Sequence, residues 1–180
     1  MHLRPHWVVA AVVLMLGVSS RFAQGGEALP NVPAAIAAPA GHDVKVRFAG
    51  KGVQIYKCMP AAQAAGEFAW SFVAPEATLS DGGGKTVGRH YAGPTWESDD
   101  GSKITGKLVA KAPAPDGVSI PWLILSATVV QGGNTFGNVA FVQRVQTSGG
   151  SAPATGCSSE TVNKEERVPY TADYYFLSAR

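Results

Sequence analysis

The sequence predicts an all-β fold, either an antiparallel β-sandwich or a partly open barrel of about nine short strands with little helix. Three observations support this prediction. Short segments alternate apolar and polar side chains, and turns containing Gly, Asp or Asn separate them. In addition, 21 glycines and 12 prolines interrupt the 180-residue chain too often for long helices. No internal repeat or shift in composition marks a second domain, so a single β domain is expected over residues 42–180.

The first half of the domain is expected to contain four strands, over residues 43–48, 53–59, 68–73 and 85–91. In the first of these, Val44, Val46 and Phe48 share one face while charged residues occupy the other, which is typical of a half-buried strand. The segment Gly50-Lys51-Gly52 is interpreted as the turn into the second strand.

The second half is expected to contain five strands, over residues 95–98, 103–111, 120–130, 135–147 and 170–178. Asp100-Gly101 supplies the positive φ that a tight hairpin turn requires. Residues 120–130 are apolar almost throughout, which is typical of a strand covered on both faces. Tyr170, Tyr174 and Phe176 lie in phase and predict a final strand that closes the sheet.

The N-terminus has the three parts of a secretory signal peptide. Met1–His6 is short and basic, an apolar run of 12 residues follows, and small residues lie near Gly25. This run is too short to span a bilayer, which needs about 20 residues. We therefore predict a signal peptide over residues 1–25 and a secreted or periplasmic protein with no stable membrane anchor. A retained N-terminal anchor is the alternative. Residues 26–41 are rich in Ala and Pro and predict a flexible lead-in.

The charge of the chain argues against several partners. Two of the 15 Lys and Arg residues lie in the predicted signal peptide, whereas all 13 Asp and Glu residues follow it, so the exported chain carries no net charge. A nucleic-acid-binding protein normally carries a basic excess on one face. Neither nucleic acid nor an anionic membrane surface is therefore an expected partner.

The chain has two cysteines, Cys58 and Cys157, and both follow the predicted signal peptide. An isolated pair in an oxidising compartment most simply forms a disulfide. Such a bridge closes a loop of about 100 residues and stabilises the fold by about 4.7 kcal/mol in the chain-entropy model. The alternative is a reactive thiol or a pair of metal ligands, although neither cysteine has a CxxC partner.

Neither a metal nor a cofactor is expected. Gly84-Lys85-Thr86 resembles the end of a phosphate-binding loop, but Leu79 stands where that loop requires its first glycine. The sequence contains no HExxH and no GxSxG motif. A zinc site would need both histidines of the exported chain, His42 and His90, together with a carboxylate.

The segment from residue 88 to 102 holds the groups best suited to bind a ligand. Around a Gly-Pro corner it contains His90, Tyr91, Trp96, Glu97 and Asp99. Trp96 lies between polar residues beside a hairpin and is expected to form an exposed platform. His90 has two interpretations: it contacts a ligand, or it bonds to the backbone and holds the corner together.

Arg144 is a further candidate for ligand binding, because it shares one face of its predicted strand with Ala140 and Val142. If it is buried, its charge requires a carboxylate partner. In the other interpretation, Arg144 marks the point at which the strand emerges into solvent.

Several motifs together resemble one known family. They are Gln54–Cys58, Trp70 with Ala74–Ala77, residues 88–102, Pro121–Leu123, Gln143–Thr147 with Gly149–Gly150 and Ala152–Pro153, and Gly156–Cys157. This family comprises exported bacterial and fungal domains of unknown function, and the resemblance spans about Pro33 to Leu177. It implies a single exported domain and assigns no catalytic residue. Some fungal members carry a malate dehydrogenase label, which this sequence does not support because it has no GxGxxG motif after a strand.

Two functions from different classes follow from these residues. The first is an exported module, associated with the cell envelope or binding a small molecule or a sugar through His90, Tyr91, Trp96, Glu97, Asp99 and Arg144. The second is a secreted hydrolase in which His90 acts with Glu97 or Asp99. The first is favoured because the sequence contains no motif for a nucleophile.

Overall fold

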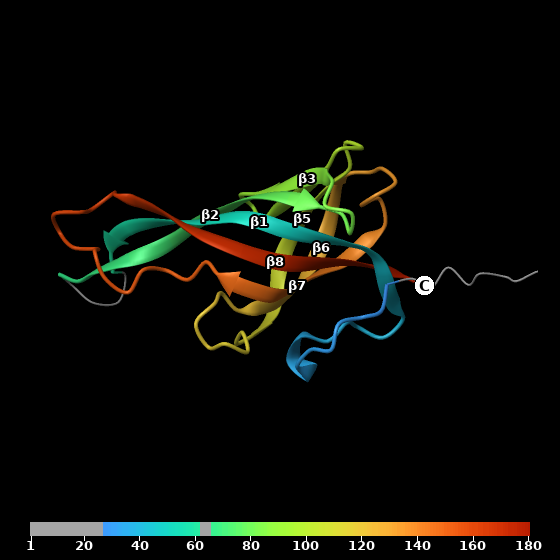
Figure 1. Ribbon diagram of the computed structural model, residues 1–180, viewed down its shortest axis with the longest axis horizontal. Helices are drawn as coiled ribbons and strands as arrows, with labels where there is room; N and C mark the ends of the chain where they lie inside the picture. The colour runs from blue at the N-terminus through green and yellow to red at the C-terminus, as the bar shows by residue number, and fades with distance from the viewer. Residues whose placement is uncertain (1–26, 62–65) are drawn as a thin grey trace, which may run out of the picture.

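The computed structural model describes residues 27–61 and 66–180, and in this part of the chain eight antiparallel strands form a closed barrel (Figure 1). The strands are β1 (His42–Pro60), β2 (Phe68–Ser80), β3 (Thr86–Tyr91), β4 (Thr95–Ser98), β5 (Lys103–Ala112), β6 (Trp122–Gln131), β7 (Val139–Gly149) and β8 (Glu165–Ala179). Each strand pairs with the next, and β1 also pairs with β8, which closes the ring. The prediction of an all-β antiparallel fold is confirmed. The predicted signal peptide lies outside the described residues.

The predicted turn at Gly50-Lys51-Gly52 is wrong, which is one reason why eight strands are found where about nine were expected. β1 runs through this segment and pairs there with both β2 and β8. A Cβ atom on Gly50 would lie 2.5 Å from Cε2 of Tyr174, and one on Gly52 would lie 2.0 Å from the carbonyl oxygen of Glu76. These glycines therefore allow close packing within a strand, which is the other common reason for glycine in a sheet.

The hairpin turn at Asp100-Gly101 is confirmed. Gly101 has a φ of 83° and connects β4 to β5. The Asp100 carboxylate accepts hydrogen bonds from the hydroxyl of Ser102 at 2.6 Å and from the backbone N–H of Thr135 at 2.8 Å. These bonds hold the pKa of Asp100 well below its usual range. This carboxylate therefore fixes the turn to the loop between β6 and β7.

Large side chains fill the end of the barrel near this turn. The buried set at this end comprises Phe48, Leu79, Ile104, Phe136, Val139 and Phe176. Phe176 is in contact with both other phenylalanines, with ring centroids 5.6 Å from Phe48 and 4.6 Å from Phe136. The hollow part of the barrel therefore lies towards its opposite end, at the corner between β3 and β4.

The segment before β1 packs on the outside of the barrel. It contains a short 3-10 helix, η1 (Ala34–Ile36), and Ile36 is fully buried in a cluster with Trp122 and Val145. The side-chain amide of Gln143 donates a hydrogen bond to the Ile36 carbonyl at 2.6 Å. Composition alone predicts a flexible lead-in here, but these contacts attach the segment to β5, β6 and β7. They also explain why β6 begins with apolar residues on both faces.

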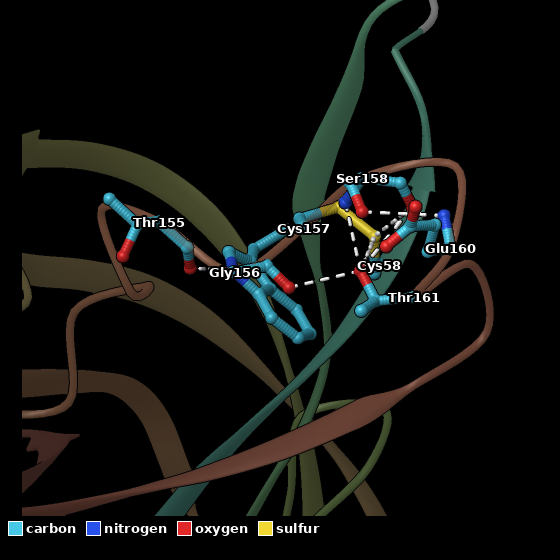
Figure 2. Close-up of a disulfide and its surroundings, with 8 residues drawn as sticks. Cys58, Thr155, Gly156, Cys157, Ser158, Glu160 and Thr161 are labelled. Atoms are coloured by element: carbon cyan, nitrogen blue, oxygen red, sulfur yellow. Dashed lines mark hydrogen bonds between the residues drawn. A yellow bond between two sulfur atoms is a disulfide. The ribbon is translucent and has the colours of Figure 1, made fainter.

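The disulfide between Cys58 and Cys157 is confirmed, with the two Cα atoms 5.3 Å apart (Figure 2). It joins the end of β1 to the long connection between β7 and β8. The same connection donates a backbone hydrogen bond from Asn163 to the carbonyl of Cys58 at 2.9 Å. In addition, the Trp70 indole donates to the Thr155 carbonyl at 2.9 Å. Together these bonds hold the parts of β1 and β2 that extend beyond the rest of the barrel at the left of Figure 1.

Replacing both cysteines by serine should lower the free energy of unfolding by about 2–5 kcal/mol, because the bridge restricts a long loop in the unfolded chain. Urea denaturation of the purified wild type and of the double variant measures the difference. The same value should be obtained by reducing the wild type. Two thiols that react in the unreduced native protein would contradict the bridge.

Gly52→Ala should lower the free energy of unfolding by about 1–3 kcal/mol, because the added methyl group meets the backbone of β2 and forces the strands apart. The melting temperature should then fall by roughly 2–4 °C per kcal/mol for a domain of this size. Gly82→Ala is the matched control, since a Cβ atom there has open space. Equal melting temperatures for the two variants would refute the packing role of Gly52.

Candidate ligand-binding cavity

A cavity of about 380 Å³ lies at the end of the barrel that carries the β3–β4 corner. Its walls are formed by Gln54, Phe72, Val73, Pro75, His90, Gly93, Pro94, Trp96, Leu108, Leu123, Leu125, Arg144 and Tyr174. The lining is mostly apolar, with a small number of polar groups. Its volume falls within the range of small-molecule sites, about 300–1,000 Å³. Three of the six predicted ligand-binding residues line this cavity: His90, Trp96 and Arg144.

Stacked rings form one wall of the cavity. His90 on β3 and Trp96 on β4 are directly paired across the hairpin. Their ring centroids are 4.4 Å apart and their planes differ by 12°, and Tyr174 contacts both rings edge-on. The expectation of an exposed platform at Trp96 is wrong, since only 1% of this residue is exposed. Its ring lies against Gly106 on β5, where a Cβ atom would come within 2.8 Å of it.

His90 is held as a neutral imidazole. Its Nδ1 lies 2.8 Å from the carbonyl oxygen of Thr95, which can only accept a hydrogen bond, so Nδ1 carries the proton. The pKa of His90 is lowered to about 3, mainly by burial and to a smaller extent by the positive charge of Arg144, while the bond to Thr95 opposes both effects. His90 therefore holds the β3–β4 corner and also lines the cavity, which combines the two interpretations of this residue.

Arg144 projects from β7 into the cavity. One of its terminal N–H groups donates to the Pro121 carbonyl at 2.7 Å. A buried Arg144 was expected to have a carboxylate partner, but within residues 27–61 and 66–180 no Asp or Glu forms an ion pair with it. Burial lowers the pKa of Arg144, and the hydroxyl groups of Tyr174, Tyr170 and Tyr56, with which no ion pair forms near neutral pH, partly oppose this effect.

Three buried hydrogen-bond donors around the cavity lack a protein partner. They are Nε2 of Gln54, Nε1 of Trp96 and Nε of Arg144, as judged over the described residues. Each belongs to a side chain that lines the cavity. A buried donor without a partner costs about 1–3 kcal/mol, and more when the group is charged. All three atoms are buried in the wall of the cavity, where their N–H dipoles place positive partial charge beside it.

The other predicted residues lie outside the barrel. The side chain of Glu97 accepts hydrogen bonds from Tyr91 at 2.6 Å and from Arg89 at 3.1 Å, and it forms an ion pair with Lys103 at 3.3 Å. The bonds from Tyr91 and Arg89 lower the pKa of Glu97 to about 2. Asp99 is exposed at the β4–β5 turn. Tyr91, Glu97 and Asp99 therefore do not join His90, Trp96 and Arg144.

These residues fall into two groups, inside and outside the barrel, because successive side chains along a strand point to opposite faces of the sheet. His90 and Trp96 face inward, whereas Tyr91 and Glu97, each one position further along, face outward. Sequence reasoning missed Gln54, Leu125 and Tyr174 as cavity residues. Tyr174 could have been predicted from the sequence, because Tyr170 and Tyr174 lie on the same face of β8, and this face points into the barrel.

The described residues contain no group of three or more His, Cys, Asp or Glu side chains that could hold a metal ion. In the same part of the chain, no helix is long and apolar enough to cross a membrane.

The fold and the cavity define an antiparallel β-barrel with an interior of the size that small-molecule sites have. A family model described as "Protein of unknown function (DUF3455)" matches residues 39–178, and the chain belongs to this family. The resemblance to a family of unknown function is thereby confirmed. Neither a curated protein nor a solved structure gives a significant match.

The buried His90 should make the fold less stable as the pH falls. Its folded pKa of about 3 lies below the unfolded value of 6.5, so protons bind preferentially to the unfolded chain between these values. The contribution of neutral His90 to the free energy of unfolding is full when the pH is above the pKa of the unfolded chain. It is lost as the pH falls towards the pKa of the folded protein. Between about pH 7.5 and about pH 5 the wild type should lose about 2 kcal/mol from this residue.

His90→Asn separates this effect from other titrations, because asparagine keeps an N–H donor for Thr95 but does not titrate. Urea denaturation of both proteins at the two pH values measures the difference. The variant should show a smaller loss at acidic pH than the wild type. Equal losses in the two proteins would show that His90 is already protonated in the folded state.

Proposed function

We propose that this protein is an exported binding protein that holds a small, largely apolar organic molecule in the cavity of its barrel. The observation that carries the proposal is the meeting of His90, Trp96 and Arg144 in one cavity whose remaining walls are mostly apolar. A concave, mostly apolar site with a few polar groups that fix orientation is typical of small-molecule binding.

Exposed apolar side chains at the mouth of the cavity support the proposal. Phe72 is 55% exposed, Val73 50% and Leu108 52%, and all three line the cavity. Apolar surface exposed to water is unfavourable by about 25 cal/mol per Å². Grouped exposure of this kind typically marks a binding site. A ligand that extends from the cavity to its mouth would cover these side chains.

This lining favours an apolar molecule over a sugar. Sugar hydroxyls require many hydrogen-bonding groups, whereas the polar side chains that line the cavity are only Gln54, His90, Arg144 and Tyr174 among the described residues. Leu123 and Leu125 face the same space. The proposal therefore narrows the small molecule or sugar expected from the sequence to an apolar compound.

The alternative of a hydrolase has less support. It requires His90 to act with Glu97 or Asp99, but the wall of the barrel separates the imidazole from both carboxylates. The low pKa of His90, about 3, also makes it a poor base near neutral pH.

Export remains part of the proposal and rests on the predicted signal peptide and on the disulfide. Disulfides form and persist mainly in oxidising compartments such as the periplasm and the extracellular space. The bridge between Cys58 and Cys157 is consistent with either location.

The test uses N-phenylnaphthylamine, a neutral apolar dye whose fluorescence rises in apolar surroundings. The folded protein should bind it at one site, and Leu123→Trp should weaken binding by about tenfold or more because the larger ring occupies the cavity. Val130→Trp is the matched control, since Val130 is exposed on β6 outside the cavity. Absence of binding to the folded wild type, or equal effects of both variants, would refute the proposal.

A further inference from the structure

The cavity contains one charged side chain. Among the described residues that line it, only Arg144 carries a charge near neutral pH, because His90 is held neutral. No carboxylate of the described residues forms an ion pair with this guanidinium. A partly buried charge without a counter-charge is costly, and proteins usually pair it or replace it. The positive charge of Arg144 therefore has no counter-charge within the described part of the cavity wall.

The guanidinium is oriented but incompletely bonded. Its bond to the Pro121 carbonyl at 2.7 Å fixes its position, while its Nε–H is buried without a partner. Arginine has five N–H donors in a planar fork that matches the two oxygens of a carboxylate. The Tyr174 hydroxyl also interacts with the guanidinium, and because the side chain is only partly buried, the terminal donors that these contacts leave free are available to an oxyanion.

The neutral unpartnered groups around the cavity are also donors. The amide Nε2 of Gln54 and the indole Nε1 of Trp96 lack partners among the described residues. Among the described residues that line the cavity, no side chain has a buried acceptor atom without a hydrogen-bond partner. Both nitrogen atoms are buried in the wall, so they favour a negative group in the cavity through their N–H dipoles and not by direct contact.

We propose that the ligand of this cavity is an amphipathic monocarboxylate whose head group is bound by Arg144. This inference rests on the proposed function and specifies its ligand. A single guanidinium balances a single negative charge, so a doubly charged phosphate would leave one charge uncompensated in an apolar site. The apolar part of the ligand lies along Leu108 and Phe72 towards the mouth.

The first experiment compares two dyes that share a ring system and differ by one anionic group. These are the neutral N-phenylnaphthylamine and anilinonaphthalene sulfonate, whose singly charged sulfonate serves as the probe for the head group. The wild type should bind the sulfonate at least about tenfold more tightly than the neutral dye. In Arg144→Met this ratio should fall below about threefold. Arg89→Met is the control, because Arg89 is exposed outside the cavity, and the ratio should be unchanged in this variant.

The second experiment uses the wild type alone, so it decides the question even where Arg144→Met does not fold. Laurate, lauryl alcohol and lauryl phosphate compete for the bound neutral dye. Laurate should displace the dye at a concentration at least about tenfold lower than the alcohol. It should also displace the dye at a lower concentration than the phosphate.

The outcomes separate this inference from the proposed function. If the neutral dye binds but the sulfonate is not preferred, the anionic head group is refuted while the proposed function stands. If the preference persists in Arg144→Met, binding of the head group by Arg144 is refuted. If lauryl phosphate displaces the neutral dye at a lower concentration than laurate does, the preference for a singly charged head group is refuted. If the neutral dye does not bind to the folded wild type, both proposals fail.

Discussion

Glycines opposite large aromatic rings determine the interior of this barrel. Tyr174 on β8 lies over Gly50 on β1, and Trp96 on β4 lies over Gly106 on β5, each within 3 Å of where a Cβ atom would be. Because these positions lack side chains, the rings lie against the barrel wall. The pairing of β1 with β8, which closes the ring of strands, takes place around Gly50 and Gly52. Closure of the barrel and the shape of its cavity therefore depend on the same backbone contacts.

The aromatic wall also determines the electrostatics of the cavity. Trp96 and Tyr174 surround His90 and remove it from water, so the imidazole remains neutral beside Arg144. A protonated His90 would place a second positive charge next to the first. The packing that holds the β3–β4 corner thus leaves one cation in the cavity, and this single charge restricts the ligand that the site can accept.

The sequence was sufficient for the fold class, the disulfide and the hairpin at Asp100-Gly101, since each depends on local pattern or on the number of cysteines. It was insufficient for β1, because glycine within a sheet and glycine in a turn look the same until the partner strand is known. Trp96 was expected to be exposed because its neighbours in the sequence are polar, but adjacent residues of a strand point to opposite faces of the sheet. The environment of Arg144 depends on β8 and on the loop before β6, contacts that no local pattern contains.

The disulfide connects this site to the stability of the rest of the fold. Gln54 and Phe72 line the cavity from the parts of β1 and β2 that lead to Cys58. The bridge to Cys157 ties these strands to the β7–β8 connection, where the Gly150 carbonyl accepts a hydrogen bond from Tyr56 at 2.7 Å. Strands that extend beyond a barrel have fewer neighbours and fray more readily than its core. By holding the extension in place, the bridge keeps one side of the cavity mouth in a fixed position relative to Arg144.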